Sequence, residues 1–277
     1  MAGSNEKMQR FVTGAALALA AVILMCFGGA VMATAALVCI CIAMYEEYHA
    51  LTVAGNRPVS WPTWVGVVLS IPLSILGGAK VLAPLILGVF LLTAICVVFR
   101  SEPRLEDALM SIMPLFSIAL PGMCVVAMSL VQPRGLQVVL LCMAFATPCV
   151  GDMCAYEVGS RIRGPKLCPA VSPNKTISGA IAGLAGSLLT TLLVGLIGYL
   201  CVSPETRLLL PSWWQYLLIG LIGGVAGQMG DLWASMVKRH CGIKDFSNLF
   251  PGHGGMLDRI DSILFMSVVV FCFCLML

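Results

Sequence analysis

Hydrophobic residues run along this chain in long, unbroken stretches rather than in an alternating or one-faced pattern. Nine apolar stretches are candidate spans, at about residues 11–27, 30–45, 61–77, 80–99, 108–130, 135–151, 176–202, 213–236 and 260–277. A helix needs roughly 20 apolar residues to cross about 30 Å of hydrocarbon, whereas the strands of a membrane barrel alternate in polarity. We therefore predict an all-α, polytopic integral membrane bundle of about nine transmembrane helices. Only Gly28 and Gly29 separate the first two stretches, so eight or ten helices stay open alternatives.

Composition supports this interpretation. Of the 277 residues, 60% are hydrophobic and 10% are charged, and the mean hydropathy is +1.00. Soluble domains carry about a quarter charged residues. The 13 cysteines are scattered through apolar stretches with no Cys-x-x-Cys pair, which is typical of small buried side chains rather than of a metal site. A soluble enzyme or a separate soluble domain is therefore not expected.

The basic residues are divided unequally between the two sides of the predicted bundle. One side holds 13 of the 16, namely Lys7, Arg10, Arg57, Arg100, Arg104, Arg161, Arg163, Lys166, Lys175, Lys238, Arg239, Lys244 and Arg259. The other side has Lys80, Arg134 and Arg207. Basic loops stay in the cytoplasm, so the first side is predicted to be cytoplasmic and the C-terminus to lie outside.

The two halves of the chain differ in character. Residues 1–151 are predicted to form N-terminal transmembrane helices whose short polar connectors, Glu46–His49 and Arg100–Arg104, serve as interfacial anchors. Residues 152–277 are predicted to form a catalytic transmembrane region with two charged cytoplasmic segments, 152–175 and 235–261.

Glycines spaced four apart mark the two helices between these segments. They include Gly179 and Gly183 in one stretch, and Gly223 and Gly227 in the next. This spacing favours close helix packing. We also expect a groove between these two helices to admit lipid.

Acidic residues lie at the predicted cytoplasmic helix ends. Asp231, Ser235 and Lys238 fall on one helical face, and Asp258 and Asp261 are three apart where the last stretch begins. An ionisable residue at membrane depth is functional by default. Carboxylates among lysines and arginines suit Mg²⁺ together with phosphate groups.

Between these acids lies a glycine-rich turn, Pro251–Gly255, which contains His253. Glycines let backbone N–H groups converge on an anion. The earlier charged segment begins at Asp152 and ends with Ser172, Lys175 and Thr176, where a serine or threonine could cap the following helix. The basic residues between them suit either phosphate binding or simple contact with anionic lipid. Acids, bases and a glycine turn together indicate phosphoryl or nucleotidyl transfer.

Residues 235–261 carry a recognisable signature. Ser235-x-x-Lys238-Arg239-x₄-Lys244-Asp245, followed by Pro251-Gly-His253-Gly-Gly-x-x-Asp258-Arg259-x-Asp261, closely resembles the phosphatidate cytidylyltransferase (CDP-diacylglycerol synthase) family. Asp152-x-x-Ala-Tyr156 and Ser172-Pro-x-Lys175-Thr176 resemble it too. The resemblance covers about 110 residues.

The resemblance implies that CMP passes from CTP to phosphatidic acid, giving CDP-diacylglycerol and pyrophosphate with the help of Mg²⁺ and, in some members, K⁺. It implies a homodimer in a bacterial inner membrane, with the site facing the cytoplasm and no nucleic-acid partner. The implied metal ligands are Asp231, Asp258 and Asp152, and the implied catalytic residues are Asp231, Asp258, Lys238, Arg239, Lys244 and Asp261. The implied substrate-binding residues are Ser172, Lys175, Thr176, Ser235, Asp245, His253, Gly254, Gly255 and Arg259.

Some positions depart from the family pattern. Ala234 stands where bacterial relatives usually have Glu, and Ser178 replaces another usual Glu. His253 could act as a general base, shape the loop or contact phosphate.

Two other functions stay open. A CTP-dependent polyprenol kinase would transfer the γ-phosphoryl group and release CDP. An ion-coupled transporter would need acids deep within several spans.

Overall fold

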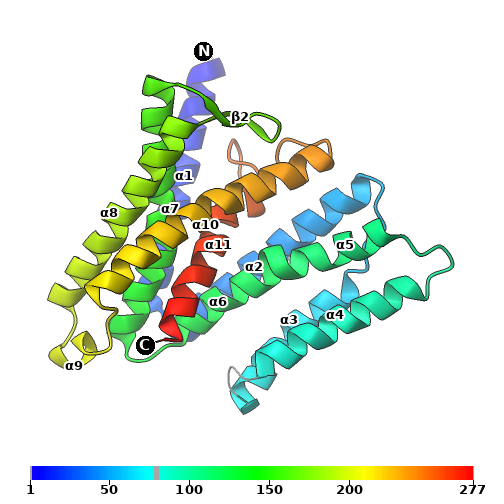
Figure 1. Ribbon diagram of the computed structural model, residues 1–277, viewed down its shortest axis with the longest axis horizontal. Helices are drawn as coiled ribbons and strands as arrows, with labels where there is room; N and C mark the ends of the chain where they lie inside the picture. Colours follow the sequence, from blue (N-terminus) through cyan, green and yellow to red (C-terminus); the bar gives the residue numbers. More distant parts are fainter. Residues whose placement is uncertain (1, 78–80, 277) are drawn as a thin grey trace.

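The computed structural model describes residues 2–77 and 81–276, which are folded mainly into helices (Figure 1). The long helices are α1 (Ala2–Phe27), α2 (Gly29–Val53), α3 (Trp61–Gly77), α4 (Leu82–Val98), α7 (Arg134–Ile162), α8 (Ile177–Cys201), α10 (Trp213–His240) and α11 (Leu257–Cys274). Between α4 and α7, α5 (Leu105–Pro114), the π-helical turn η2 (Leu115–Ala119) and α6 (Leu120–Ser129) follow one another without a break. A short α9 (Pro204–Arg207) connects α8 to α10.

Each predicted apolar stretch falls on a helix, which confirms the helical membrane bundle. Among the described residues, five continuous helices are long and apolar enough to cross a membrane: α2, Leu105–Ser129, α7, α8 and α10. Shorter apolar stretches lie at Val12–Phe27 and Pro84–Val98. The number of nine crossings stays a prediction. The predicted break between the first two helices is confirmed, because Gly28 and Gly29 have φ angles of 59° and 52°, which residues with a side chain rarely adopt.

Several helices continue past the predicted membrane boundary. The expectation that residues 152–175 form a loop is wrong for the first part, since α7 continues to Ile162. Charged residues do not interrupt a helix whose backbone hydrogen bonds are internal. Gly159 also fits closely against α8, because a Cβ atom there would lie 3.3 Å from Cα of Gly179. The helix therefore extends to where its packing partner ends.

A β-hairpin replaces the rest of that predicted loop. Strands β1 (Lys166–Cys168) and β2 (Ser172–Thr176) pair antiparallel. The Thr176 side chain then caps α8 by accepting a hydrogen bond of 3.1 Å from the backbone N–H of Gly179. The prediction that Ser172 or Thr176 caps this helix is thus confirmed for Thr176.

The glycine-spaced helices α8 and α10 pack tightly. A Cβ atom on Gly220 would lie 2.9 Å from Cα of Leu188, and one on Gly224 would lie 2.8 Å from Cβ of Ser187. Gly223 instead faces the Met266 side chain of α11. At these positions the small residues bring the two helices into direct contact, and the lipid groove expected between them stays a prediction.

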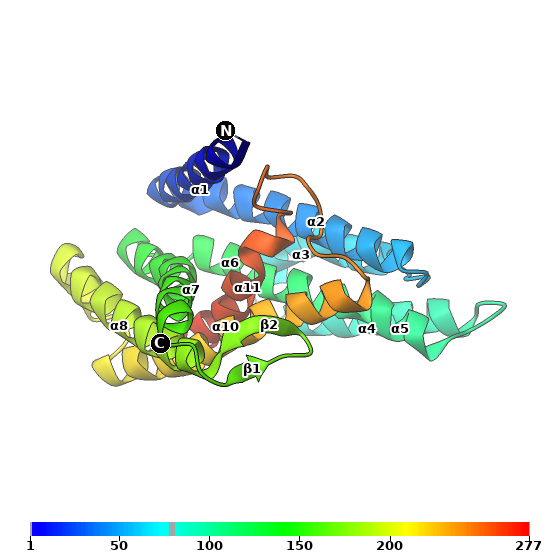
Figure 2. The ribbon, with the colours of Figure 1, turned by 90° about the horizontal axis from the view of Figure 1, so that it is seen from above.

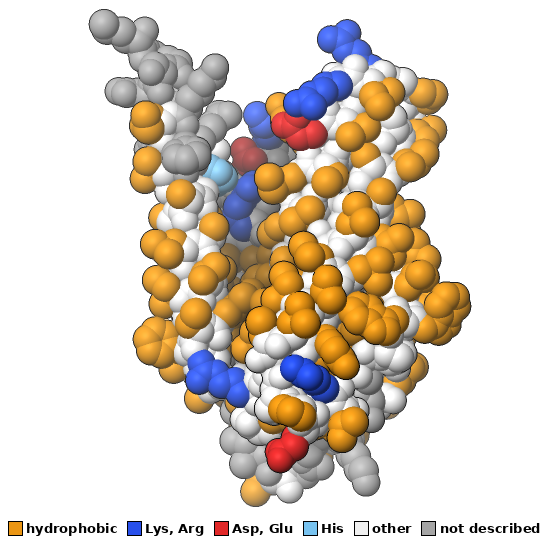
Figure 3. Space-filling model, turned by 90° about the vertical axis from the view of Figure 1, so that its left-hand side faces the viewer, with side chains coloured by type: hydrophobic (Ala, Val, Ile, Leu, Met, Phe, Trp, Pro, Cys, Tyr) orange, Lys and Arg blue, Asp and Glu red, His pale blue; other side chains and the backbone are white. Residues whose placement is uncertain are grey.

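The bundle has two polar ends and an apolar middle. The hairpin and the connection from α10 to α11 lie at one end, with α9 at the other (Figures 1 and 2). Figure 3 shows hydrophobic side chains over the middle of one face and charged side chains at both ends, some of them in a hollow near the hairpin end. The α3–α4 pair lies at the edge and contacts α5 and η2.

Candidate active site

Four segments from the C-terminal half meet at the hairpin end of the bundle. They are the C-terminal part of α7, the β2–α8 junction, the last turns of α10 and the first turns of α11. In Figure 2 the hairpin lies beside the end of α10. The structure thus brings the two charged segments of the sequence together.

Asp231 is the acidic centre of this junction. Its Oδ2 atom lies 2.5 Å from Nζ of Lys175, which is on β2, and both side chains are nearly three-quarters buried. Ser235, one turn further along α10, donates a long hydrogen bond of 3.5 Å to Oδ1. The sequence predicted that Asp231 and Ser235 share one helical face. The structure adds that the ammonium group of Lys175 neutralises Asp231.

Asp152 and Asp261 lie near Asp231, and each of the two carboxylates is repelled by it. Ser262 links them, since its hydroxyl donates at 3.3 Å to Asp152 Oδ2 and lies 3.4 Å from Asp261 Oδ1. The backbone of α11 at Asp261 touches Gly230 of α10, which allows this close approach. Three acids from three helices therefore form a partly compensated negative site.

Asp258 has a different environment. Its Oδ1 atom lies 2.6 Å from Nζ of Lys238, and its Oδ2 atom accepts 2.9 Å hydrogen bonds from the backbone N–H groups of Phe246 and Gly255. The Asp258 side chain is only 2% exposed. Buried charges persist where they are paired and hydrogen bonded in this way. Asp258 therefore binds both Lys238 and the loop that connects α10 to α11.

The glycine turn folds back on itself. Phe250 N–H donates to the Gly254 carbonyl at 2.9 Å, and His253 N–H donates to the Phe250 carbonyl at 2.8 Å. Gly254 has a φ angle of +77°, and a Cβ atom there would lie 2.8 Å from Oδ2 of Asp258. Of the backbone N–H groups of this turn, that of Gly255 donates to the carboxylate of Asp258, and anion binding by the turn stays a prediction.

His253 is half-buried, and its Nε2 atom lies beside Gly14 of α1. Its Nδ1 atom is buried without a hydrogen-bond partner among the described residues. Whether His253 acts as a base, shapes the loop or contacts phosphate therefore stays a prediction.

The remaining predicted phosphate contacts surround this centre. Lys244, Asp245 and Arg259 are exposed on the loop and on α11. Arg239, also exposed, donates at 3.4 Å to the carbonyl groups of Val171 and Ile243, and so joins the hairpin to the end of α10. Ser172 opens β2 and is half-buried.

Glu46 was missed as a residue that supports the site, and its neighbour Glu47 was missed as a buried acid. They were predicted, with Tyr48, to be interfacial anchors, and this is wrong because all three are buried. Glu46 accepts hydrogen bonds from Ser247 Oγ at 2.6 Å and from the backbone N–H groups of Met256 and Leu257 at 2.9 and 2.8 Å. Two adjacent acids at the end of an apolar stretch were the only sequence signal.

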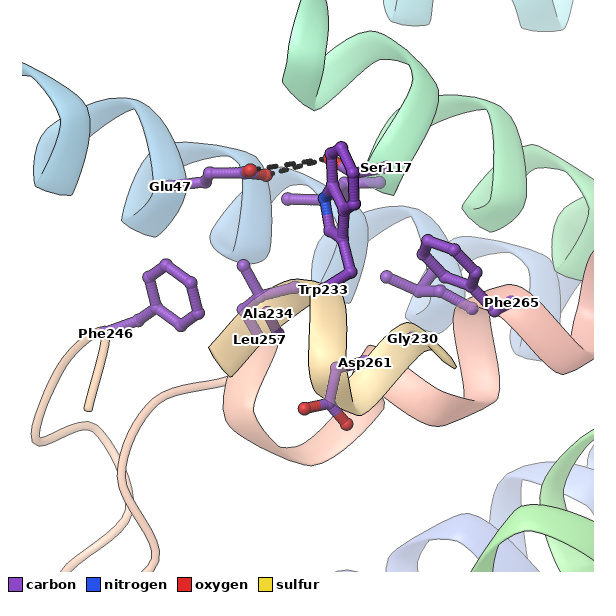
Figure 4. A pocket seen from close by; sticks show the side chains of 11 residues that line it. Glu47, Ser117, Gly230, Trp233, Ala234, Phe246, Leu257, Asp261 and Phe265 are labelled. Carbon is purple, nitrogen blue, oxygen red and sulfur yellow. Dashed lines mark hydrogen bonds between the residues drawn. The ribbon is translucent and has the colours of Figure 1, made fainter. Parts of the chain in front are cut away.

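Glu47 lies in a small cavity beneath the site. Its carboxylate accepts a 3.1 Å hydrogen bond from Ser117 of η2, and the cavity also touches Trp233, Ala234 and Asp261 (Figure 4). The Asp261 carboxylate points away from Glu47 in this view. Ala234, where an acid was expected, therefore belongs to the buried wall below the carboxylates.

Carboxylate oxygens are the ligands that Mg²⁺ prefers, and the mutual repulsion of Asp152, Asp231 and Asp261 favours a cation between them. Within the described ranges, however, no three acidic, histidine or cysteine side chains already stand close enough to hold one metal ion. Lys175 and Lys238 currently neutralise Asp231 and Asp258. The residues fit a hard cation in kind, and their ligand roles stay predictions.

Comparison with known proteins agrees with this chemistry. Residues 8–277 match the cytidylyltransferase family. The chain is 36% identical over 176 residues to the phosphatidate cytidylyltransferase of Staphylococcus saprophyticus, covering 64% of this chain and 62% of that protein. It is 39% identical over 129 residues to the Brucella suis enzyme of that name (47% and 44%), and 38% identical over 150 residues to the Synechocystis one (52% and 45%). The match thus spans about half the length of these relatives. Because the family match covers nearly the whole sequence, the chain belongs to the cytidylyltransferase family.

Proposed function

We propose that this protein transfers CMP from CTP to phosphatidic acid. In this reaction a phosphate oxygen of the lipid forms a bond to the α-phosphorus of CTP, the bond to the β-phosphate oxygen breaks, and pyrophosphate leaves. The observation that carries the proposal is the junction of α7, β2, α10 and α11, where lysine ammonium groups contact buried acids within one membrane-end site. The relatives' names supply the substrates.

The basic residues have the charge that two phosphorylated substrates require. Lys175 and Lys238 lie inside the junction, while Arg239, Lys244 and Arg259 are exposed around it. Lysine binds phosphate as a mobile point charge, and arginine can bind it with two hydrogen bonds. We assign the inner lysines to the reacting phosphates and the outer residues to the rest of the triphosphate and the lipid headgroup.

The carboxylates fit Mg²⁺, with K⁺ as a further cation. Mg²⁺ supplies neutralisation of the triphosphate and of the departing pyrophosphate. Asp231, Asp152 and Asp261 would hold it, because these acids repel one another and are only partly compensated. Asp258 would join this set only by giving up Lys238 and two backbone donors.

The site is proposed to face the cytoplasm of a bacterial inner membrane, in a homodimer. The basic loops support that orientation, and the named relatives are bacterial. The charged hairpin end also suits contact with anionic lipid headgroups.

The test uses purified protein in detergent with phosphatidic acid, Mg²⁺ and CTP labelled in the α-phosphate. Wild type is expected to put label into lipid and to release pyrophosphate. Asp231→Asn is expected to lower the rate by at least about 100-fold, because the site loses a charge positioned for the transition state. Its thermal unfolding is expected to stay close to wild type, since Asp231 is part of a partly exposed ion pair.

Label reaching lipid from γ-labelled CTP instead would contradict nucleotidyl transfer and indicate a lipid kinase. Folded wild type that labels lipid from neither nucleotide would contradict both enzymatic functions. An active Asp231→Asn variant would remove Asp231 from the proposed catalytic set.

A further inference from the structure

We propose that Glu46 is a positioning residue for the active site, acting through the N-terminus of α11. Glu46 belongs to α2, in the half of the chain that otherwise serves as a membrane scaffold, and it is 4% exposed. Its hydrogen-bond partners lie more than 200 positions away in the sequence. The inference deepens the proposed cytidylyl transfer and rests on it for its kinetic consequence.

The first turn of α11 needs an acceptor that its own sequence does not provide. The N-cap residue, Met256, makes no side-chain capping hydrogen bond. Unpaired N–H groups at a buried helix start are costly, and the helix dipole places positive charge there. Glu46 satisfies both demands, since its two oxygens accept from the N–H groups of Met256 and Leu257. A side chain of α2 thus serves as the cap of α11.

The same carboxylate also ties the middle of the α10–α11 loop, residues 241–256, to the end of that loop. Ser247 donates its hydroxyl to Oε1 of Glu46 at 2.6 Å, while Met256 donates to that same oxygen from the end of the loop. Asp258 makes a parallel clamp by accepting from Phe246 and Gly255. Two buried acids from distant helices therefore close the loop at its base.

Gly255 fits between these clamps for a steric reason. A Cβ atom at this position would lie 2.6 Å from each carboxylate oxygen of Glu46. Any larger residue would push Glu46 away from α11. Besides its predicted role in substrate binding, Gly255 thus has a structural reason to lack a side chain.

The consequence for the reaction follows from the geometry of α11. Asp258 and Asp261 lie on its first two turns, so a shift of its N-terminus moves both carboxylates relative to Asp152 and Asp231. A displacement of about 1 Å in a reacting group can cost on the order of 100-fold in rate. Glu46 touches none of the proposed reacting groups and acts by fixing the helix that carries them.

Glu46→Gln tests the proposal. The amide keeps one oxygen acceptor, replaces the other oxygen with an N–H₂ donor and carries no negative charge. The N–H groups of α11 therefore lose one of their two acceptors. We expect kcat to fall by about 10- to 100-fold, with KM for CTP changed by less than about threefold. Hydrogen exchange at Met256 and Leu257 should become faster in the variant. Ser247→Ala removes a single donor and should give the same pattern with a smaller loss, of about two- to fivefold.

Glu47→Gln is the matched control, because Glu47 is the next residue, is equally buried and bonds to Ser117 rather than to the loop. It should leave kcat within about twofold and the exchange of the loop unchanged. Unaltered exchange at Met256 and Leu257 in Glu46→Gln would overturn the proposal. Equal loss of kcat and thermal stability in both Gln variants would also overturn it, since that indicates a general burial effect.

Failure of the proposed function gives a different result. Wild type without cytidylyl transfer would refute the reaction, while faster exchange in Glu46→Gln alone would still establish that Glu46 holds the start of α11. If Glu46→Gln does not fold, Ser247→Ala decides by the same two measurements, and normal kcat with normal exchange in that variant would overturn the proposal.

Discussion

Two groups of acids at the hairpin end of the bundle differ in how completely they are satisfied. Asp258 and Glu46 each accept three hydrogen bonds or ion-pair contacts and are almost fully buried. Asp152, Asp231 and Asp261 instead repel one another. Asp261 is as buried as Asp258, but among the described residues it accepts hydrogen bonds from Ser262 alone, including one of 2.7 Å from the backbone N–H group. We call the first group the clamping acids and the second the open acids.

The difference separates support from chemistry within one cluster. A carboxylate whose oxygens are occupied by lysine and backbone N–H groups stabilises the fold around it. A carboxylate with spare oxygens keeps the capacity to bind a cation or a phosphate-bound metal. Both groups contain aspartates at helix ends beside basic residues, so residue type alone cannot distinguish them. The following experiments would break or sharpen this distinction.

The largest expected combined effect is that of Asp258→Asn. Removing the charge leaves Lys238 buried with a weaker partner, which costs about 3 kcal/mol in the free energy of unfolding, and activity should fall by about 100-fold because the loop and α11 loosen. Thermal unfolding and the labelled-lipid assay measure the two effects. Asp231→Asn should lose activity without this loss of stability.

Asp107→Asn is the control for Asp258→Asn. Asp107 is also a buried acid that accepts from a backbone N–H group, that of Arg57 at 2.9 Å, and it pairs with Arg100 rather than with a residue of the proposed site. Its loss should lower stability and leave the rate constant per folded molecule unchanged. An Asp258→Asn protein as stable as wild type would show that Asp258 is not a clamping acid.

Sequence could predict the bundle because each transmembrane helix satisfies its own backbone and therefore needs a continuous apolar stretch. The location of the site was also predictable, because a chain with so few charges concentrates them in two segments. Asp231, Lys238 and Asp258, which the structure brings to one end of the bundle, were singled out in this way. Their pairing was not, since nothing in the spacing relates Lys175 on the hairpin to Asp231 on α10.

The part played by α2 was beyond prediction for a related reason. Glu46 bonds mainly to backbone N–H groups, which every residue except proline carries and which therefore leave no trace in the sequence. Its neighbours also suggested an interfacial anchor. Likewise, the π-helical turn that brings Ser117 to Glu47 lies inside a stretch that reads as one regular helix.

A smaller effect is expected from Lys175→Ala, which leaves the open acid Asp231 without its cation. The ion pair is partly exposed, so its loss should cost less than about 1 kcal/mol of stability. Loss of a charged contact to CTP should raise KM for CTP about tenfold. Steady-state kinetics over a range of CTP concentrations measures this shift.

Lys175→Arg keeps the positive charge and should recover most of the affinity lost in Lys175→Ala. If Lys175→Ala unfolds more easily than wild type by several kcal/mol and binds CTP normally, the Lys175–Asp231 pair clamps the fold, and the division between the two groups of acids fails at this point.

The smallest expected effect is that of Ser262→Ala. The Ser262 hydroxyl lies 3.3 Å from Asp152 and 3.4 Å from Asp261, distances at the long end for hydrogen bonds from a hydroxyl. Removing it should lower kcat/KM by about two- to threefold, because a weak hydrogen bond contributes about 0.5 kcal/mol. Ser267→Ala removes a hydroxyl from the same helix that bonds to the Pro121 carbonyl instead, and should leave kcat/KM unchanged. A loss of 100-fold in Ser262→Ala would mean that Asp152 and Asp261 depend on this hydroxyl for their positions. These two residues would then no longer qualify as open acids.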